Sequence, residues 1–110
     1  MSLPNFEEAY IPEQKISDYL LSETHAVGKA KARYFRSIGY TEKHADELTE
    51  ALLMIAKSEK VHRKIVSPYG TKYLIDGEIA TPFGIKARLR TVWVVEPHDK
   101  RPRLVTAYPA

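Results

Sequence analysis

The spacing of apolar residues changes once along this chain, near Lys60, and this change restricts the fold more than any other feature of the sequence. Before it, apolar residues recur every three or four positions, as at Ala45, Leu48, Leu52 and Ile55, which predicts helices. After it, they alternate with polar residues, which predicts strands. Helices followed by consecutive strands are typical of an α+β domain, so we expect N-terminal helices packed on one face of a roughly four-stranded antiparallel sheet.

The first half of the chain is predicted to hold three helices. Apolar residues at helical spacing place a short one over 16–21 and a second over 26–37, which Gly39 would end as a C-terminal cap. Thr41 has the hydroxyl of a good N-cap for the third and longest helix, which should end within 57–60.

The second half is predicted to hold four strands. The strand that starts at Thr71 leaves two alternatives open at Asp76-Gly77, because the alternation of side chains continues to Ile79, whereas Asp-Gly is also typical of a tight hairpin turn. The predicted strands cover 61–66, 71–76, 85–95 and 103–107, and the predicted connections cover 67–70, 81–84 and 97–102.

Length and composition fit one small domain. With 110 residues, 44% of them apolar, the chain can fill a single core, so we expect an extended lead-in over 1–14 and one α+β domain over 15–110. No apolar run approaches the length of a membrane helix, and the N-terminus lacks the basic and apolar segments of a signal peptide. Both features favour a cytoplasmic protein with no membrane partner.

Several classes of site are excluded by the residues that the chain lacks. It has no cysteine, which rules out disulfides, thiolate zinc sites and a cysteine nucleophile. No set of His and carboxylate residues has the spacing of metal ligands, and no glycine-rich phosphate loop occurs. We therefore expect neither a metal nor another cofactor.

Charge is distributed unevenly along the chain. Residues 1–59 carry seven Lys or Arg and ten Asp or Glu, a net −3, whereas residues 60–110 carry ten and four, a net +6. The predicted sheet is thus basic and could attract a polyanion such as RNA. The alternative is a solvated sheet surface protected by lysines.

The predicted strand over 85–95 carries three cations on one face. Because alternate side chains point to opposite sides, Lys86, Arg88 and Arg90 would stand in a row at intervals of about 7 Å. Such spacing resembles that of successive phosphates in a nucleic-acid backbone, and the arginine fork suits a phosphate. Thr106 and Tyr108 would lie nearby if the last strand pairs with this one, although both residue types are common in strands for packing alone.

A second candidate site lies at the start of the predicted second helix. His25 and Lys29 are four residues apart and would share a helical face, close to backbone amides that favour an anion. A histidine beside a lysine can support metal-independent phosphodiester transfer. The alternative is structural, with His25 capping the helix and Lys29 exposed. Lys31 and Arg33 would lie on other faces, as weaker candidates for binding nucleic acid.

Six groups of residues carry a resemblance to known proteins. They are Tyr19-Leu-Leu-Ser22, His25-Ala-Val-Gly-Lys-Ala-Lys-Ala-Arg-Tyr-Phe35 with Gly39, Tyr69-Gly-Thr-Lys-Tyr73 with Asp76-Gly77, Pro82-Phe-Gly84, Arg90-Thr-Val-Trp93 and Arg103-Leu-Val-Thr-Ala-Tyr-Pro109. Together they resemble an uncharacterised bacterial domain family associated with toxins and mobile elements. That pattern is similar in turn to small metal-independent ribonucleases of the barnase, EndoU and RelE type.

The resemblance implies N-terminal helices against a four-stranded antiparallel sheet, and it implies roles for five residues. His25 would act as general base or acid, and Lys29 would clamp the phosphate. Arg90 would stabilise the transition state, while Thr106 and Tyr108 would position the scissile phosphate.

Residues and resemblance together predict a cytoplasmic toxin domain that cleaves RNA by metal-independent transesterification and leaves a cyclic phosphate. Its expected partners are RNA and an acidic antitoxin or immunity protein. The alternative is a non-catalytic module of phage or mobile-element origin that binds nucleic acid or protein with the same basic sheet.

Overall fold

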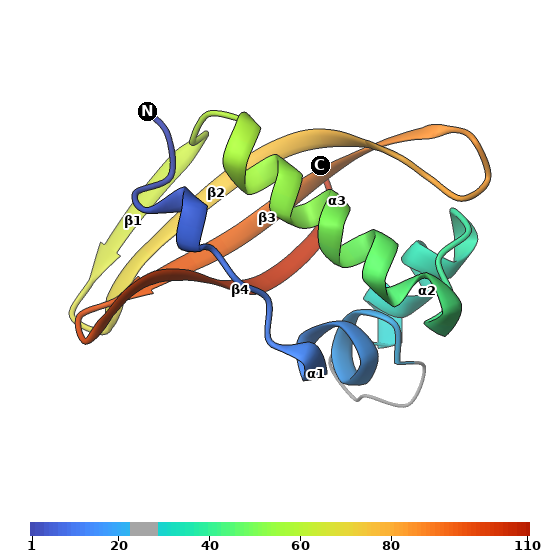
Figure 1. Cartoon of the computed structure of the whole chain (residues 1–110), viewed down its shortest axis with the longest axis horizontal. Helices are drawn as coiled ribbons and strands as arrows, with labels where there is room; N and C mark the ends of the chain where they lie inside the picture. Colours follow the sequence, from blue (N-terminus) through green and yellow to red (C-terminus); the bar gives the residue numbers. More distant parts are fainter. Residues whose placement is uncertain (23–28) are drawn as a thin grey trace.

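The computed structural model places helices against a four-stranded antiparallel sheet (Figure 1), which confirms the predicted fold class. It describes residues 1–22 and 29–110. The strands of this sheet lie side by side in chain order, so each pairs with the next through a short connection. They are β1 (Arg63–Ser67), β2 (Gly70–Ala80), β3 (Lys86–Glu96) and β4 (Asp99–Pro109).

The helices occupy two places relative to the sheet. The longest lies across one face over β2, and the shorter ones within 13–20 and 29–37 lie beyond the β4 edge (Figure 1). We call the face under the longest helix the inner face and the opposite one the outer face. The helices are α1 (Glu13–Lys15), which continues into the π-helical turn η2 (Ile16–Leu20), then α2 (Lys29–Ser37) and α3 (Ala45–Ser58).

Local hydrogen bonds set the end of α2 and the start of α3. Gly39 has a φ of 109°, which favours glycine, and the next residue, Tyr40, donates its backbone N–H to the Phe35 carbonyl. The Thr41 hydroxyl then accepts from a backbone N–H of the next turn, and the His44 ring accepts from the Thr41 backbone N–H. The predicted cap at Gly39 is confirmed, whereas Thr41 caps a short 3-10 turn, Glu42–His44, that leads into α3, and the N-cap residue of α3 itself is His44.

An apolar core fills the space between the helices and the inner face. Its largest fully buried side chains include Trp93, Tyr40 and Phe35. The buried Thr91 hydroxyl donates to the Ile75 carbonyl at 2.7 Å and accepts from the Trp93 indole N–H at 2.8 Å. These polar atoms are therefore paired although they are buried.

β2 runs without a break from Gly70 to Ala80, so the hairpin alternative at Asp76-Gly77 is wrong and the strand alternative is correct. Gly77 has a packing function here. A Cβ atom on Gly77 would lie 2.8 Å from Ile55 Cγ1, inside the ordinary carbon–carbon contact of about 3.5–4.0 Å. The missing side chain lets α3 approach the strand closely.

The predicted loop over 97–102 is present but too long, because only residues 97–98 connect the strands and β4 already begins at Asp99. Pro102 lies within this strand, which is tolerated because β4 is an edge strand of the sheet. Tyr10 pairs with that edge: its backbone N–H donates to the Pro102 carbonyl, and its carbonyl accepts from the Leu104 N–H.

In the described part of the chain, no helix combines the length and the apolar character needed to cross a membrane.

Candidate functional site

Alternation along β3 divides its side chains between the two faces of the sheet. Leu89 and Trp93 are fully buried in the core on the inner face. Lys86, Arg88 and Arg90 alternate with them and so point to the outer face, where Lys86 and Arg88 are exposed and Arg90 is partly exposed. A row of cations therefore lies on the side of the sheet away from α3.

Strand pairing brings two hydroxyl side chains of β4 next to this row. Tyr108 is opposite Arg90, and Thr106 is opposite Val92. These two cross-strand pairs are neighbours, about 7 Å apart along the strands. Asp76 of β2 is opposite Arg90 on its other side, so a polar line of Asp76, Arg90 and Tyr108 crosses three strands.

Asp76 holds Arg90 through a two-point ion pair. Arg90 Nε donates to Oδ1 at 2.8 Å and Nη2 donates to Oδ2 at 3.0 Å, and the Asp76 side chain is only 12% exposed. The hydrogen bonds from Arg90 hold the pKa of Asp76 below its ordinary 3.8, and the nearby charge of Arg88 lowers it further. The same hydrogen bonds raise the pKa of Arg90, to which Tyr108 also contributes. The guanidinium is thus charged and fixed in orientation.

A second group of contacts joins η2 and α2 to β4. The Tyr19 hydroxyl lies 3.2 Å from the Thr106 hydroxyl, within hydrogen-bond distance. The ammonium groups of Lys15 and Lys31 lie 4.9 and 5.8 Å from the centre of the Tyr19 ring, close enough for cation–π attraction. Arg103 lines the same shallow groove as Lys15 and Tyr19. Three cationic side chains, with the carboxylate of Asp18, therefore surround Tyr19, whose hydroxyl meets that of Thr106.

The other predicted site residues are not brought to these contacts. Lys86 lies four residues from Arg90, about 13 Å along the strand. Lys29 and Arg33 are both exposed on α2, and because they are four residues apart they share a face, which corrects the expectation of different faces. His25 lies outside the described residues, so its position relative to Lys29 stays a prediction.

Asp76, Tyr19 and Lys15 are site residues that the sequence analysis does not single out as candidates. Asp76 meets Arg90 because of the register between β2 and β3, which no local pattern specifies. Tyr19 belongs to the apolar stripe of the predicted first helix, and only its polar end distinguishes it from a packing residue. Lys15 precedes Tyr19 by four residues, the spacing of neighbours on a helix, and this signal could have found it.

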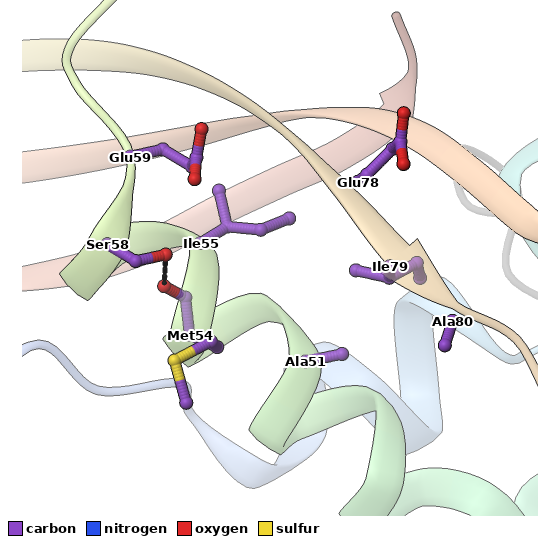
Figure 2. Close-up of a pocket in the computed structure, with 8 residues that line it drawn as sticks. All are labelled: Ala51, Met54, Ile55, Ser58, Glu59, Glu78, Ile79 and Ala80. Atoms are coloured by element: carbon purple, nitrogen blue, oxygen red, sulfur yellow. Dashed lines mark hydrogen bonds between the residues drawn. The ribbon is translucent and has the colours of Figure 1, made fainter.

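Among the residues that the structure describes, no three His, Asp or Glu side chains gather closely enough to hold a metal ion. A separate pocket lies between α3 and the far end of β2 (Figure 2), two strands away from Thr106. The outer face of β3 and β4 is thus a cationic surface with two hydroxyl groups. Its chemistry suits the binding of an anion.

A family model described as Domain of unknown function (DUF6883) matches residues 2–110. The chain belongs to this family. The resemblance to an uncharacterised domain family is therefore confirmed, and the description of DUF6883 names no activity. No curated protein matches the sequence.

The fold of this DUF6883 chain also occurs in a solved structure described as "Contact-dependent growth inhibition toxin - immunity protein complex from Klebsiella pneumoniae 342". A chain of that complex matches with a TM-score of 0.74 over 96% of both chains, at 16% sequence identity. At this identity the likeness establishes a shared fold and leaves the activity open.

Proposed function

We propose that this DUF6883 chain is a toxin domain with endoribonuclease activity that needs no metal. The observation that carries this proposal is the arrangement on the outer face, where Arg90 and Tyr108 form one cross-strand pair and Thr106 belongs to the next. Two hydroxyl groups beside a fixed guanidinium can together bind the phosphate of an RNA backbone. The toxin named in the description of the structural neighbour supports the same class of function.

The proposed reaction is an internal transesterification. The ribose 2′-oxygen attacks the adjacent phosphorus, the bond from phosphorus to the 5′-oxygen breaks, and a 2′,3′-cyclic phosphate remains. The 2′-hydroxyl gives its proton to a base, for which we propose His25, and the departing 5′-oxygen takes up a proton from solvent water. Arg90 and Lys29 would offset the negative charge on the non-bridging oxygens, while Thr106 and Tyr108 would hold those oxygens by hydrogen bonds.

Asp76 fits this mechanism as a positioning residue. Its carboxylate takes two of the five N–H donors of Arg90 and fixes the plane of the guanidinium. The other donors can then face a phosphate. The same carboxylate offsets the charge of Arg90, and this favours the second candidate function, a module that binds nucleic acid or protein without cleaving it.

The surrounding cations would hold the rest of the RNA and attract a protein inhibitor. Lys86 and Arg88 extend the site along β3, and Lys31 and Arg33 extend it along α2. A protein that blocks this surface would need acidic residues to match it. Because the description of the neighbour includes an immunity protein, we propose an acidic immunity or antitoxin partner that acts in the cytoplasm.

The test is incubation of the purified protein with total bacterial RNA in EDTA, followed by mapping of the product ends. Arg90→Gln, Tyr108→Phe and His25→Ala are each expected to slow cleavage about 100-fold or more. Arg101→Gln is the matched control, because Asp99 holds Arg101 in a similar ion pair at the opposite end of β4.

Cleavage that leaves a cyclic phosphate, is lost in the three variants and is kept in the control would support the ribonuclease proposal. If the wild type binds RNA and leaves it intact, the binding module becomes the better description. Equal cleavage by all four variants would remove these residues from the mechanism.

A further inference from the structure

One edge of β2 is only partly covered by β1. β1 pairs with β2 no further than Leu74, whereas β2 continues to Ala80. The Leu74 carbonyl accepts from the His62 backbone N–H at 2.8 Å, and the Ala80 carbonyl accepts from the Tyr40 hydroxyl at 3.4 Å. Between these two contacts, no strand from the described residues lies beside the edge of β2.

The main-chain groups that face this gap belong to Asp76 and Glu78. In an antiparallel strand the N–H and C=O groups of alternate residues point to opposite edges. The Leu74 and Ala80 carbonyls accept their hydrogen bonds on the edge of β2 that faces away from β3. The N–H and C=O groups of Asp76 and Glu78 therefore point to that same edge. In the part of the chain that the structure describes, these two N–H and two C=O groups have no hydrogen-bond partner on that side.

An apolar pocket of about 200 Å³ lies beside this open edge (Figure 2). Ile55 of α3 and Ile79 of β2 contribute to its lining, and Met54, a residue that is 61% exposed, lies at its rim. Figure 2 shows the carboxylates of Glu59 and Glu78 pointing the same way, on either side of Ile55. Both glutamates are exposed, and within the described residues neither forms an ion pair.

We propose that an extended segment of a partner protein adds to β2 as a further strand at Asp76 and Glu78. The unpaired N–H and C=O groups of Asp76 and Glu78 favour an extended partner. Only an extended backbone can form hydrogen bonds with two alternate residues along one strand edge. The pocket selects an apolar side chain on that segment, and the two glutamates select a lysine or arginine beside it. This surface is the open edge of β2 and the pocket beside it. The inference does not depend on the proposed ribonuclease activity.

Charge complementarity distinguishes this occupant from an acidic inhibitor. The outer face of β3 is cationic, whereas the rim of the pocket carries two carboxylates, Glu59 at the end of α3 and Glu78 on β2, where Glu78 stands opposite Arg88 of β3. A basic segment would therefore be repelled by the cationic row and attracted to the pocket.

The first experiment measures amide hydrogen exchange of the wild-type protein by NMR. The Asp76 and Glu78 amides should exchange at least about 100-fold faster than those of Ile75 and Ile79, whose N–H groups point to β3. Protection of both amides at every protein concentration would overturn the open edge. Protection that grows with protein concentration would identify a second copy as the occupant and overturn the partner protein.

The second experiment measures binding of five-residue peptides that alternate leucine or valine with lysine or arginine, by fluorescence anisotropy. Saturable binding below about 1 mM is expected, together with slower exchange at Asp76 and Glu78. The Glu59→Lys/Glu78→Lys variant should bind at least about fivefold more weakly. Glu50→Lys, an exposed position of α3 that does not line the pocket, is the matched control and should bind normally.

The best-binding peptide, with its backbone N-methylated, tests the strand geometry directly. N-methylation removes the donors that a strand needs, so binding should be lost. Equal binding with or without N-methylation, equal binding by the charge-reversed variant, or no binding by any peptide up to about 1 mM would each overturn the inference.

Discussion

Replacing Gly77 by alanine is expected to destabilise the fold by about 1–2 kcal/mol. The added Cβ would lie 2.8 and 3.1 Å from the two γ-carbons of Ile55 and 3.2 Å from Glu59 Cγ, where carbon atoms ordinarily meet at about 3.5–4.0 Å. Inserting a methyl group into such a packed contact costs about 1–3 kcal/mol. Alanine also restricts the conformations of the unfolded chain more than glycine does, which offsets about 0.4–1 kcal/mol of this loss of stability.

Urea unfolding followed by the fluorescence of Trp93 would measure this loss, since Trp93 is fully buried in the folded state. The midpoint of thermal unfolding should fall by roughly 5–10 °C for a domain of this size. In an Ile55→Ala background, which removes both γ-carbons, Gly77→Ala should be neutral or slightly stabilising. An equal loss of stability in both backgrounds, or no loss with Ile55 present, would refute the packing explanation of Gly77.

Three further predictions concern the core and the outer face. Thr91→Val removes the acceptor of the Trp93 indole N–H and should lower the free energy of unfolding by about 1–3 kcal/mol; a urea midpoint like that of the wild type would contradict this. Because Arg90 holds the pKa of Asp76 below 3.8 in the folded state, their pair stabilises the fold fully above pH 3.8 and loses this effect as the pH falls through the lower folded value. Urea unfolding over a pH series should therefore show that Asp76→Asn loses less stability than the wild type on acidification, and equal losses would count against the pairing. Arg88→Gln/Arg90→Gln should reduce the salt slope of RNA binding by about 2, one for each phosphate contact, and an unchanged slope would reject those contacts.

Part of the candidate site follows from sequence, because alternation along a strand is a local property. The outer-face position of Arg88 and Arg90 depends only on which residues of β3 are apolar. Thr106 and Tyr108 join them only if β4 pairs with β3 in a particular register, which the structure supplies. Tyr19 reaches Thr106 across 87 residues of sequence, and no local pattern predicts such a contact.

The sequence by itself determined the order of helices and strands in this protein. Gly39 ends α2, and Thr41 begins the helical turn before α3, through hydrogen bonds among residues a few positions apart. A short stretch of sequence therefore contains all the groups involved. The same is true of the change in apolar spacing near Lys60, which reports the secondary structure of each half. The fold class followed because apolar helices and a one-sided sheet must cover each other.

Only the tertiary structure decided where strands continue and which residues meet across them. Asp76-Gly77 is compatible with a turn by its own chemistry, and it remains in β2 because strand pairing and the approach of Ile55 favour extended backbone there. Pro102 is compatible with a loop, and it lies in β4 because Tyr10 pairs with that edge. In both cases the conformation is decided by the summed free energy of contacts between distant parts of the chain. The local propensity of these residues does not include those contacts and is too weak to override them.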